Sequence, residues 1–224
     1  MKKSFATNQL GFTLIEMIVS LGVFSVVVTT AVGAMLVLIS TNQQLQSEQS
    51  VMTNLAFALD TMTREIRTGY YYYCDQQANY AAGGPNNIFN NSNNHESVVG
   101  TNVQDCPNGR SPSTHNLQGI SFYEGGSSIT GTTGARRIAY FFDGTDPDNK
   151  TIMRRVGNTE AQSIVSSGLV IVNAEFVVTG SEGLDGGDAE QPTVTVYIEA
   201  QDRSDATGKS YYLQTTITQR TLDL

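Results

Sequence analysis

The chain is short of positive charge. Only 13 of its 224 residues are lysine or arginine, against 21 aspartates and glutamates, and the net charge at neutral pH is −8. No basic residue occurs between Lys3 and Arg64, and neither half of the chain has a sustained basic stripe. Nucleic-acid binding requires a basic surface that neutralises phosphates. The composition therefore argues against nucleic acid as a partner.

Residues that commonly carry catalysis are also scarce. The two histidines, His95 and His115, have no nucleophile and acid near them in the sequence with which to form a triad. The chain has no Gly-rich phosphate loop and no internal repeat. We therefore expect no enzymatic activity and no cofactor.

There are only two cysteines, Cys74 and Cys106. A zinc site would require Cys or His pairs two to four residues apart, which this spacing does not provide. An even number of cysteines in an exported domain favours a disulfide, and two free thiols in a reducing compartment are the alternative. A bridge closing a loop of this size would contribute roughly 3–4 kcal/mol in the chain-entropy model.

Charge is almost absent from one long stretch. The 28 residues from Phe12 to Ile39 contain a single charged side chain, Glu16. A helix of this length measures about 42 Å, against a hydrocarbon core of about 30 Å. A cleaved secretory signal has its small residue after a shorter apolar run, whereas Gly11 precedes this one. We therefore expect a helix that crosses a membrane and projects beyond it, with Lys2 and Lys3 on the cytoplasmic side.

The start of the chain resembles the signal of type IV pilins and of type II secretion pseudopilins. The resemblance covers about the first forty residues and rests on Lys2, Lys3 and the run Gly11-Phe12-Thr13-Leu14-Ile15-Glu16. In that family a prepilin peptidase cuts after the glycine, here Gly11, and N-methylates the new terminus, here Phe12. The resemblance implies four kinds of partner: this peptidase and methyltransferase, other pilins or pseudopilins, an inner-membrane assembly platform, and membrane lipid before assembly.

The glutamate at the fifth mature position, here Glu16, is thought in that family to pair with the terminal amine of a neighbouring subunit. The physical argument agrees. A lone carboxylate at the bilayer centre costs on the order of 3 kcal/mol or more, and a neighbouring ammonium reduces that cost. Cleavage after Gly11 leaves Phe12 with an amine that is largely cationic at neutral pH. Subunits stacked with an axial offset could pair these charges and so fix their register. The alternative is a protonated or snorkelling glutamate in a simple anchor.

Beyond Ile39 the sequence predicts that the helix continues. Ser40 to Gln44 is polar but contains neither Gly nor Pro, and Gly69 is a plausible stop. We expect Asp60 and Arg64, four residues apart, to pair on the exposed side. An apolar stripe with helical spacing predicts packing against a domain. Its members are Leu45, Met52, Leu55, Leu59, Met62 and Ile66.

The remainder of the chain predicts an antiparallel sheet of five or six strands, with one face covered by the amphipathic half of the helix. The fold class is therefore α+β, which is also the pilin-like architecture that the resemblance at the N-terminus implies. We expect the tyrosine run Tyr70–Tyr73 to be partly buried at the start of the domain. The expected strands are Ile120–Tyr123, Arg137–Phe142, Thr151–Val156, Leu169–Thr179, Thr193–Ala200 and Tyr211–Arg220. The expected organisation is a leader at 1–11, a membrane-spanning half helix at 12–40, an amphipathic half at 41–69, and an extracytoplasmic β-rich domain at 70–224 with a long loop at 75–118.

Two acidic clusters are weak candidates for calcium binding, because oxygen-rich turns can hold this ion and some pseudopilins bind it in C-terminal loops. The first contains Asp143, Asp146 and Asp148, and the second contains Glu182, Asp185, Asp188 and Glu190. Neither has the spacing of an EF-hand. We interpret both as solvated acidic turns.

The last hundred residues are similar to J-type minor pseudopilins and related minor pilins, which have large β domains. The resemblance therefore implies a minor structural subunit. It would be held in the inner membrane by one span, with its C-terminal domain extracytoplasmic, before it enters a pilus or pseudopilus. A membrane-anchored adhesin or binding protein, using the loop at 75–116, and a tethered enzyme are the alternatives. Secretion, competence, adhesion and motility systems share this type of N-terminus.

Overall fold

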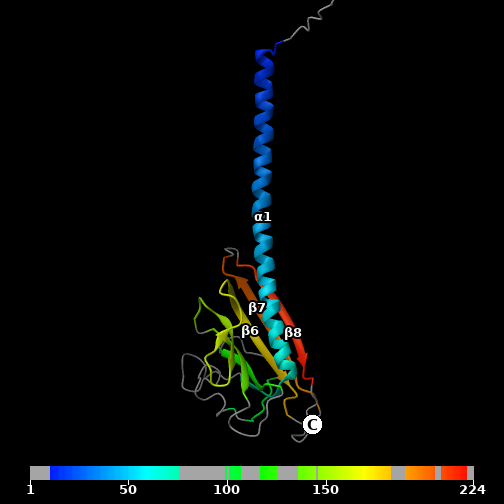
Figure 1. Ribbon diagram of the computed structural model, residues 1–224, viewed down its shortest axis with the longest axis vertical. Coiled ribbons are helices and arrows are strands. Elements are labelled where there is room, and N and C mark those ends of the chain that lie inside the picture. The colour runs from blue at the N-terminus through cyan, green and yellow to red at the C-terminus, as the bar shows by residue number, and fades with distance from the viewer. Residues whose placement is uncertain are drawn as a thin grey trace, which may run out of the picture. The chain divides into compact units, whose positions relative to one another are not determined.

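The computed structural model describes residues 11–75, 99, 101–106, 117–125, 136–144, 146–182, 190–204 and 208–220. The chain divides after Glu48 into two units, which are described separately below. One helix, α1 (Leu14–Thr68), begins in the first unit and ends in the second (Figure 1). The leader lies outside the described residues, apart from Gly11.

The helix is unbroken across its polar middle, as the absence of Gly and Pro between Ser40 and Gln44 predicts. It ends one residue before Gly69, whose N–H donates to the carbonyl of Ile66 at 3.0 Å. A Cβ atom at position 69 would overlap the ring of Phe122. Glycine is therefore required here for close packing as the chain leaves the helix.

The buried stripe of α1 differs in part from the predicted one. Leu55, Met62 and Ile66 are buried, but the prediction was wrong for Leu45 and Met52, which are 50% and 44% exposed. Leu45 is exposed because burial of the helix begins only at Val51. Met52 is exposed because it lies about 100° around the helix from the buried Val51. The buried helix residues are Val51, Leu55, Ala58, Met62 and Ile66, with spacings of three and four.

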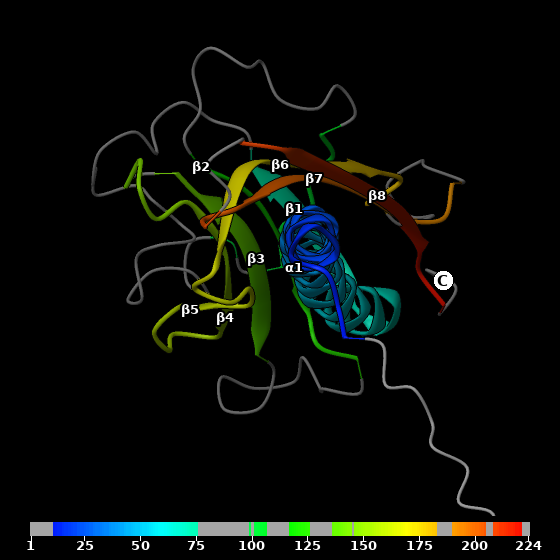
Figure 2. The ribbon, with the colours of Figure 1, turned by 90° about the horizontal axis from the view of Figure 1, so that it is seen from above.

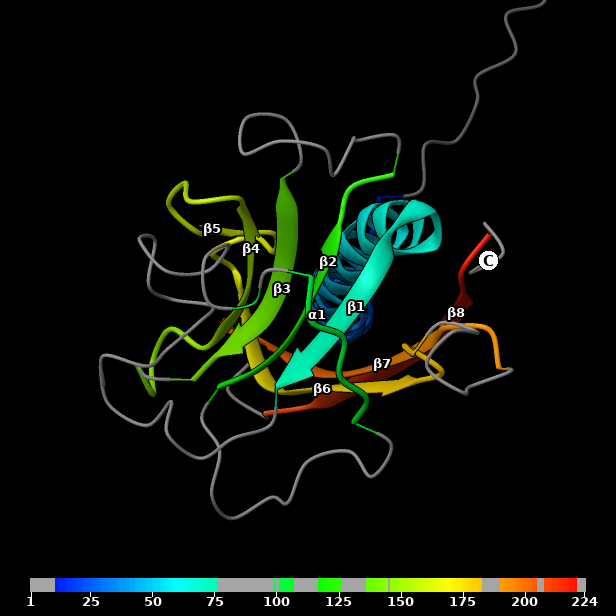
Figure 3. The ribbon, with the colours of Figure 1, turned by 90° about the horizontal axis from the view of Figure 1, so that it is seen from below.

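The strands form two antiparallel sheets, where the sequence predicted one (Figures 2 and 3). Sheet A has the order β1-β2-β3-β4-β5 and sheet B the order β6-β7-β8. The strands of sheet A are β1 (Tyr70–Asp75), β2 (Leu117–Tyr123), β3 (Arg137–Asp143), β4 (Thr151–Val156) and β5 (Gln162–Ser163). Those of sheet B are β6 (Leu169–Thr179), β7 (Thr193–Asp202) and β8 (Ser210–Thr218).

Two of the eight strands in the described part of the chain were not predicted. Strand β1 is the tyrosine run, in which the alternation of buried Tyr72 and Cys74 with exposed Tyr71 is hidden by residues of one type. Strand β5 has only two residues, too few for any periodic pattern. The two predicted hairpins, β3–β4 and β7–β8, are present in antiparallel register.

The hydrophobic core lies between the two sheets and the buried face of α1 (Figure 3). Large side chains come from every layer: Met62 from the helix, Phe122 and Tyr140 from sheet A, and Phe176 from sheet B. In β7 the even-numbered residues from Val194 to Ala200 are buried and the odd-numbered ones are more exposed, as expected for a sheet with one solvated face.

A short segment joins the two sheets. Gln104 pairs with β1, because Cys74 N donates to Gln104 O at 2.9 Å and Gln104 N donates to Tyr72 O at 3.1 Å. Two residues on, Cys106 and Val178 of β6 exchange two backbone hydrogen bonds of 2.9 and 3.3 Å. Residues 104–106, in the loop expected at 75–118, therefore pair with strands of both sheets and belong to no named strand themselves. Residues 76–98, 100 and 107–116 lie outside the described part of the chain.

Candidate assembly site

The expected cleavage point lies just before α1. Gly11, Phe12 and Thr13 precede the first helical residue, and all three are exposed, Phe12 by 82%. A Cβ atom at Gly11 would meet no atom within 4 Å. The described part of the fold therefore does not require glycine at position 11.

Thr13 caps the start of the helix. Its Oγ1 accepts a hydrogen bond from the N–H of Glu16 at 3.4 Å, and its carbonyl accepts one from Met17 at 3.2 Å. Thr13 and Glu16 thus have the Thr-x-x-Glu spacing of a capping box. This signal is present in the sequence, but the cap was not predicted. The Glu16 carboxylate also lies in the first turn, where the helix dipole favours an anion.

The polar side chains near the helix start share one side. Thr13, Glu16 and Ser20 are separated by three and four residues and line one shallow groove with Val19 and Val23. Ser20 Oγ donates to the carbonyl of Met17 at 3.0 Å, so its hydroxyl is satisfied within the helix. Glu16 thus places a carboxyl group among otherwise apolar or internally bonded groups.

The rest of the first unit presents an apolar surface. Every residue from Gly11 to Gln46 is exposed. The hydroxyls of Ser25, Thr29 and Thr41 each donate to a backbone carbonyl four residues earlier, at 2.8–2.9 Å. Such internal bonds are the means by which polar side chains are satisfied in lipid. Helix α1 is long and apolar enough to cross a membrane.

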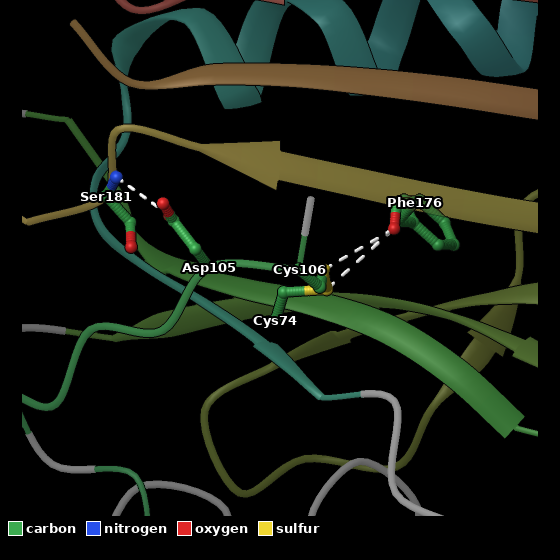
Figure 4. Close-up of a disulfide and its surroundings, with 5 residues drawn as sticks. All are labelled: Cys74, Asp105, Cys106, Phe176 and Ser181. Carbon is green, nitrogen blue, oxygen red and sulfur yellow. Dashed lines mark hydrogen bonds between the residues drawn. A yellow bond between two sulfur atoms is a disulfide. The ribbon is translucent and has the colours of Figure 1, made fainter. Parts of the chain in front are cut away.

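In the second unit, Cys74 and Cys106 form a disulfide with their Cα atoms 5.9 Å apart (Figure 4). Both residues are buried, and their sulfur atoms lie 3.8 and 3.5 Å from the carbonyl oxygen of Phe176 in β6. Because Cys74 belongs to sheet A and Cys106 pairs with sheet B, the bridge fixes the segment that joins the two sheets.

Asp105 holds the same segment from its other side. One carboxylate oxygen accepts a hydrogen bond from the backbone N–H of Gly180 at 3.0 Å. The other accepts one from the N–H of Ser181 at 2.9 Å (Figure 4). Gly180 has φ = 69°, a left-handed conformation that glycine adopts without strain and that directs two successive N–H groups at one anion. The sequence carries no local signal for this contact, since Gly180 and Ser181 lie 75 and 76 residues after Asp105.

The acidic turn after β3 uses its carboxylates within the turn. Asp146 accepts hydrogen bonds from Asn149 Nδ2 at 2.7 Å and Asp148 N at 3.0 Å, and these bonds lower the pKa of Asp146. Asp143 is half-buried, whereas Asp146 and Asp148 are exposed. Among the described residues, no group of three or more acidic, His or Cys side chains is placed to hold a metal ion. Of the other candidates, Asp185, Asp188, His95 and His115 lie outside the described residues.

The comparison with protein families identifies the start of the chain. The prokaryotic N-terminal methylation motif matches residues 6–32, a range that includes Gly11, Phe12 and Glu16. No curated protein and no solved structure matches the chain significantly. The matched signal implies processing by a prepilin peptidase and assembly with other pilins. The chain therefore carries a prepilin-type N-terminal signal of the type IV pilin and pseudopilin class, on an apolar helix that is followed by antiparallel β-sheets.

Proposed function

We propose that this chain is a minor structural subunit of a type IV pilus or a type II secretion-like filament. It enters the inner membrane as a prepilin with its N-terminus in the cytoplasm. It is cut after Gly11, methylated on Phe12, and assembled through α1, and it catalyses no reaction itself. The observation that carries the proposal is that this signal, at residues 6–32, runs into a helix whose residues are exposed from Leu14 to Gln46.

The exposed part of α1 supports both stages of this life cycle. Its large apolar side chains would be unfavourable in water, and either lipid or neighbouring helices can cover them. Gly22 and Gly33 interrupt this surface, and a Cβ atom at either position would meet nothing within 4 Å. Such flat positions allow helix backbones to approach closely in an apolar environment.

Glu16 supplies the register in this proposal. The amine of a processed Phe12 is the nearest cation that another subunit of the same kind can offer at this depth. A pair between chains offsets the cost of holding each charge in an apolar filament core. Because only one axial offset brings the two groups together, the pair selects a single stacking arrangement.

The β domain supports a minor role. A major subunit packs in many copies, which favours a compact domain. The described residues of this chain instead form eight strands in two sheets, and a long stretch of sequence separates β1 from β2. Those features suit a subunit of low abundance or one at the filament tip.

The mature N-terminus tests the proposal directly. Intact-mass and peptide mass spectrometry of the chain from cells with a prepilin peptidase should find a methylated Phe12 as the first residue. Gly11→Leu, which alters the expected cleavage site and meets no steric obstacle in this fold, should stay full length and membrane-bound. An intact Met1 in the wild-type protein, or a cut at any other bond, would contradict the proposal.

A membrane-anchored binding protein is the second candidate, and the outer face of sheet B favours it. Tyr197 and Tyr212 are 40% and 72% exposed beside a shallow groove of about 370 Å³. The carboxylate of Glu199 accepts a hydrogen bond from the Tyr212 hydroxyl at 3.1 Å. Adhesion by cells that display the chain but cannot assemble filaments would favour this candidate over the first.

A further inference from the structure

Three arginines converge beside the end of α1. Arg64 and Arg67 lie in the last turns of the helix, and Arg220 follows β8. The N–H of Arg220 donates to the carbonyl of Arg67 at 2.8 Å, so the two backbones are in direct contact. The three arginines line a shallow basin of about 500 Å³, and the other lining residues are Asp60, Thr63 and Thr68.

The segment that carries Arg220 is held in place by a buried side chain. Gln219 is 5% exposed, and its Nε2 donates to the carbonyl of Gly69 at 2.9 Å. Its N–H donates to the carbonyl of Pro192 at 3.0 Å. The position of Arg220 is therefore set before any ligand arrives, which reduces the entropy that binding would cost.

Carboxylates of the described residues do not balance the charges in the basin. Arg64 pairs with Asp60 at 3.1 Å, but no carboxylate among the described residues pairs with Arg67 or Arg220. Arg67 complements the negative end of the helix dipole. Arg220 reaches the same end of the helix, where its N–H bonds the carbonyl of Arg67, so the dipole favours its charge as well but supplies no carboxylate to pair with it. Among the described residues that line the basin, three cations thus face one anion, in a chain whose net charge is −8.

We propose that this arginine basin binds a carboxylate-bearing loop of a neighbouring pilin-like subunit, an inference that rests on the proposed filament function. Guanidinium groups bind carboxylates through paired hydrogen bonds, which fixes orientation as well as adding attraction. Acidic domains packed side by side repel one another, and a local basic patch converts one such contact into an attractive one. The basin thereby selects which flank of the neighbour the β domain contacts.

A peptide probe tests the chemistry of the basin. Fluorescein-labelled hexaglutamate is titrated against the full chain in detergent micelles. It should bind at 20 mM salt on the order of tenfold more tightly than at 0.3 M salt, since the attraction is screened. The combined variant Arg64→Gln, Arg67→Gln, Arg220→Gln should bind hexaglutamate at least about tenfold more weakly than the wild type. A loss of this order is expected when a few charge-assisted hydrogen bonds are removed. Arg136→Gln, which removes an exposed arginine elsewhere, is the matched control and should bind as wild type.

Competing occupants give distinct results. Preferential binding of a labelled thymidine hexanucleotide, with no binding of hexaglutamate, would overturn the assignment to an acidic protein segment. Asp223 follows Arg220 closely in the sequence and lies outside the described residues. Hexaglutamate binding by Asp223→Asn but not by the wild type would make the chain's own terminus the occupant, which would also overturn the proposal.

The cellular test separates this inference from the proposed function. A photo-crosslinking amino acid at Thr63 should capture another filament subunit in assembled filaments, and the triple arginine variant should lower that yield at least fivefold. Equal yields would refute the basin as the contact. Filament entry with a methylated Phe12 but no hexaglutamate binding would reject the basin alone, whereas an unprocessed leader would reject the filament function itself.

Discussion

Arg154 of β4 binds Glu65 of α1 through two parallel hydrogen bonds. Its Nε lies 3.0 Å from Glu65 Oε2, and its Nη2 lies 2.7 Å from Glu65 Oε1. The hydroxyl of Tyr140 in β3 donates to the same carboxylate. The side chains of Arg154 and Glu65 are only 30% and 25% exposed. This pair therefore fixes the last turns of the helix against sheet A with a geometry that hydrophobic packing alone does not specify.

Glu65→Gln should destabilise the chain by about 1–3 kcal/mol, because a hydrogen bond to a charged group is lost and Arg154 is left half-buried without its anion. Urea unfolding in detergent micelles, followed by tyrosine fluorescence, measures the change. The matched control is Asp60→Asn, which removes the exposed pair with Arg64 on the same helix. It should change the free energy of unfolding by less than about 1 kcal/mol. Equal losses in the two variants would contradict the special role of Glu65.

Tyr140 should make the stability fall in alkaline solution. Burial, followed by the hydrogen bond to Glu65, raises the pKa of Tyr140 above its ordinary value. The unfolded chain releases this proton above about pH 10 while the folded chain retains it, so unfolding becomes more favourable as pH rises. The stabilisation is fully present below about pH 10 and declines by up to about 1.4 kcal/mol per pH unit above it.

The comparison of wild type with Tyr140→Phe isolates this effect from the other tyrosines. The variant should be less stable at pH 8, because it lacks the hydrogen bond to Glu65, and the difference should shrink above about pH 10. A difference that stays constant from pH 8 to pH 11 would show that Tyr140 titrates equally in both states.

The disulfide should contribute about 2–4 kcal/mol, since it closes a loop between residues 32 apart in sequence. Replacing Cys74 and Cys106 together with alanine removes it without leaving a free thiol, and urea unfolding of the oxidised wild type is the reference. Asp105→Asn keeps the bridge and removes only the negative charge of the side chain that accepts hydrogen bonds from the N–H groups of Gly180 and Ser181. That variant should cost about 1–2 kcal/mol. A doubly substituted chain as stable as wild type would refute the structural role of the bridge.

Glu16→Ala should still insert and be cut after Gly11, but it should fail to enter filaments, because Phe12 of a neighbour then has no anion to pair with. Quantitative immunoblotting of membrane and sheared-filament fractions measures this. Ser20→Ala is the matched control on the same side of the helix, and it should assemble normally because the hydroxyl bonds only within its own helix. Normal assembly of the Glu16 variant would reject the register role.

Features that depend on near neighbours in the sequence could be predicted. The apolar run, the unbroken helix and the ends of β4 and β6 follow from composition and periodicity, and the structure has them at the expected residues. The exposed pair of Asp60 and Arg64 is also present, at 3.1 Å, because a spacing of four residues brings side chains together on any helix.

Features that depend on distant residues could not. Arg137 shows this: it is fully buried in β3, where its Nε donates to Ser121 Oγ at 2.8 Å and its Nη2 donates to Tyr71 O at 2.7 Å. That bond holds the carbonyl of a residue with φ = 54°, a conformation rarely adopted by non-glycine residues. A buried arginine and a strained tyrosine are both exceptions to the residue preferences on which sequence reasoning depends.

The sequence alone therefore determined the prepilin-type signal at Gly11, Phe12 and Glu16 and the helix that follows, because a cleavage motif and an apolar period are local properties of the chain. Only the tertiary structure divided the strands into two sheets and placed residues 104–106 between them. It alone brought Arg220 to Arg67, since 152 residues separate the two in the sequence and no local pattern records which distant backbones meet.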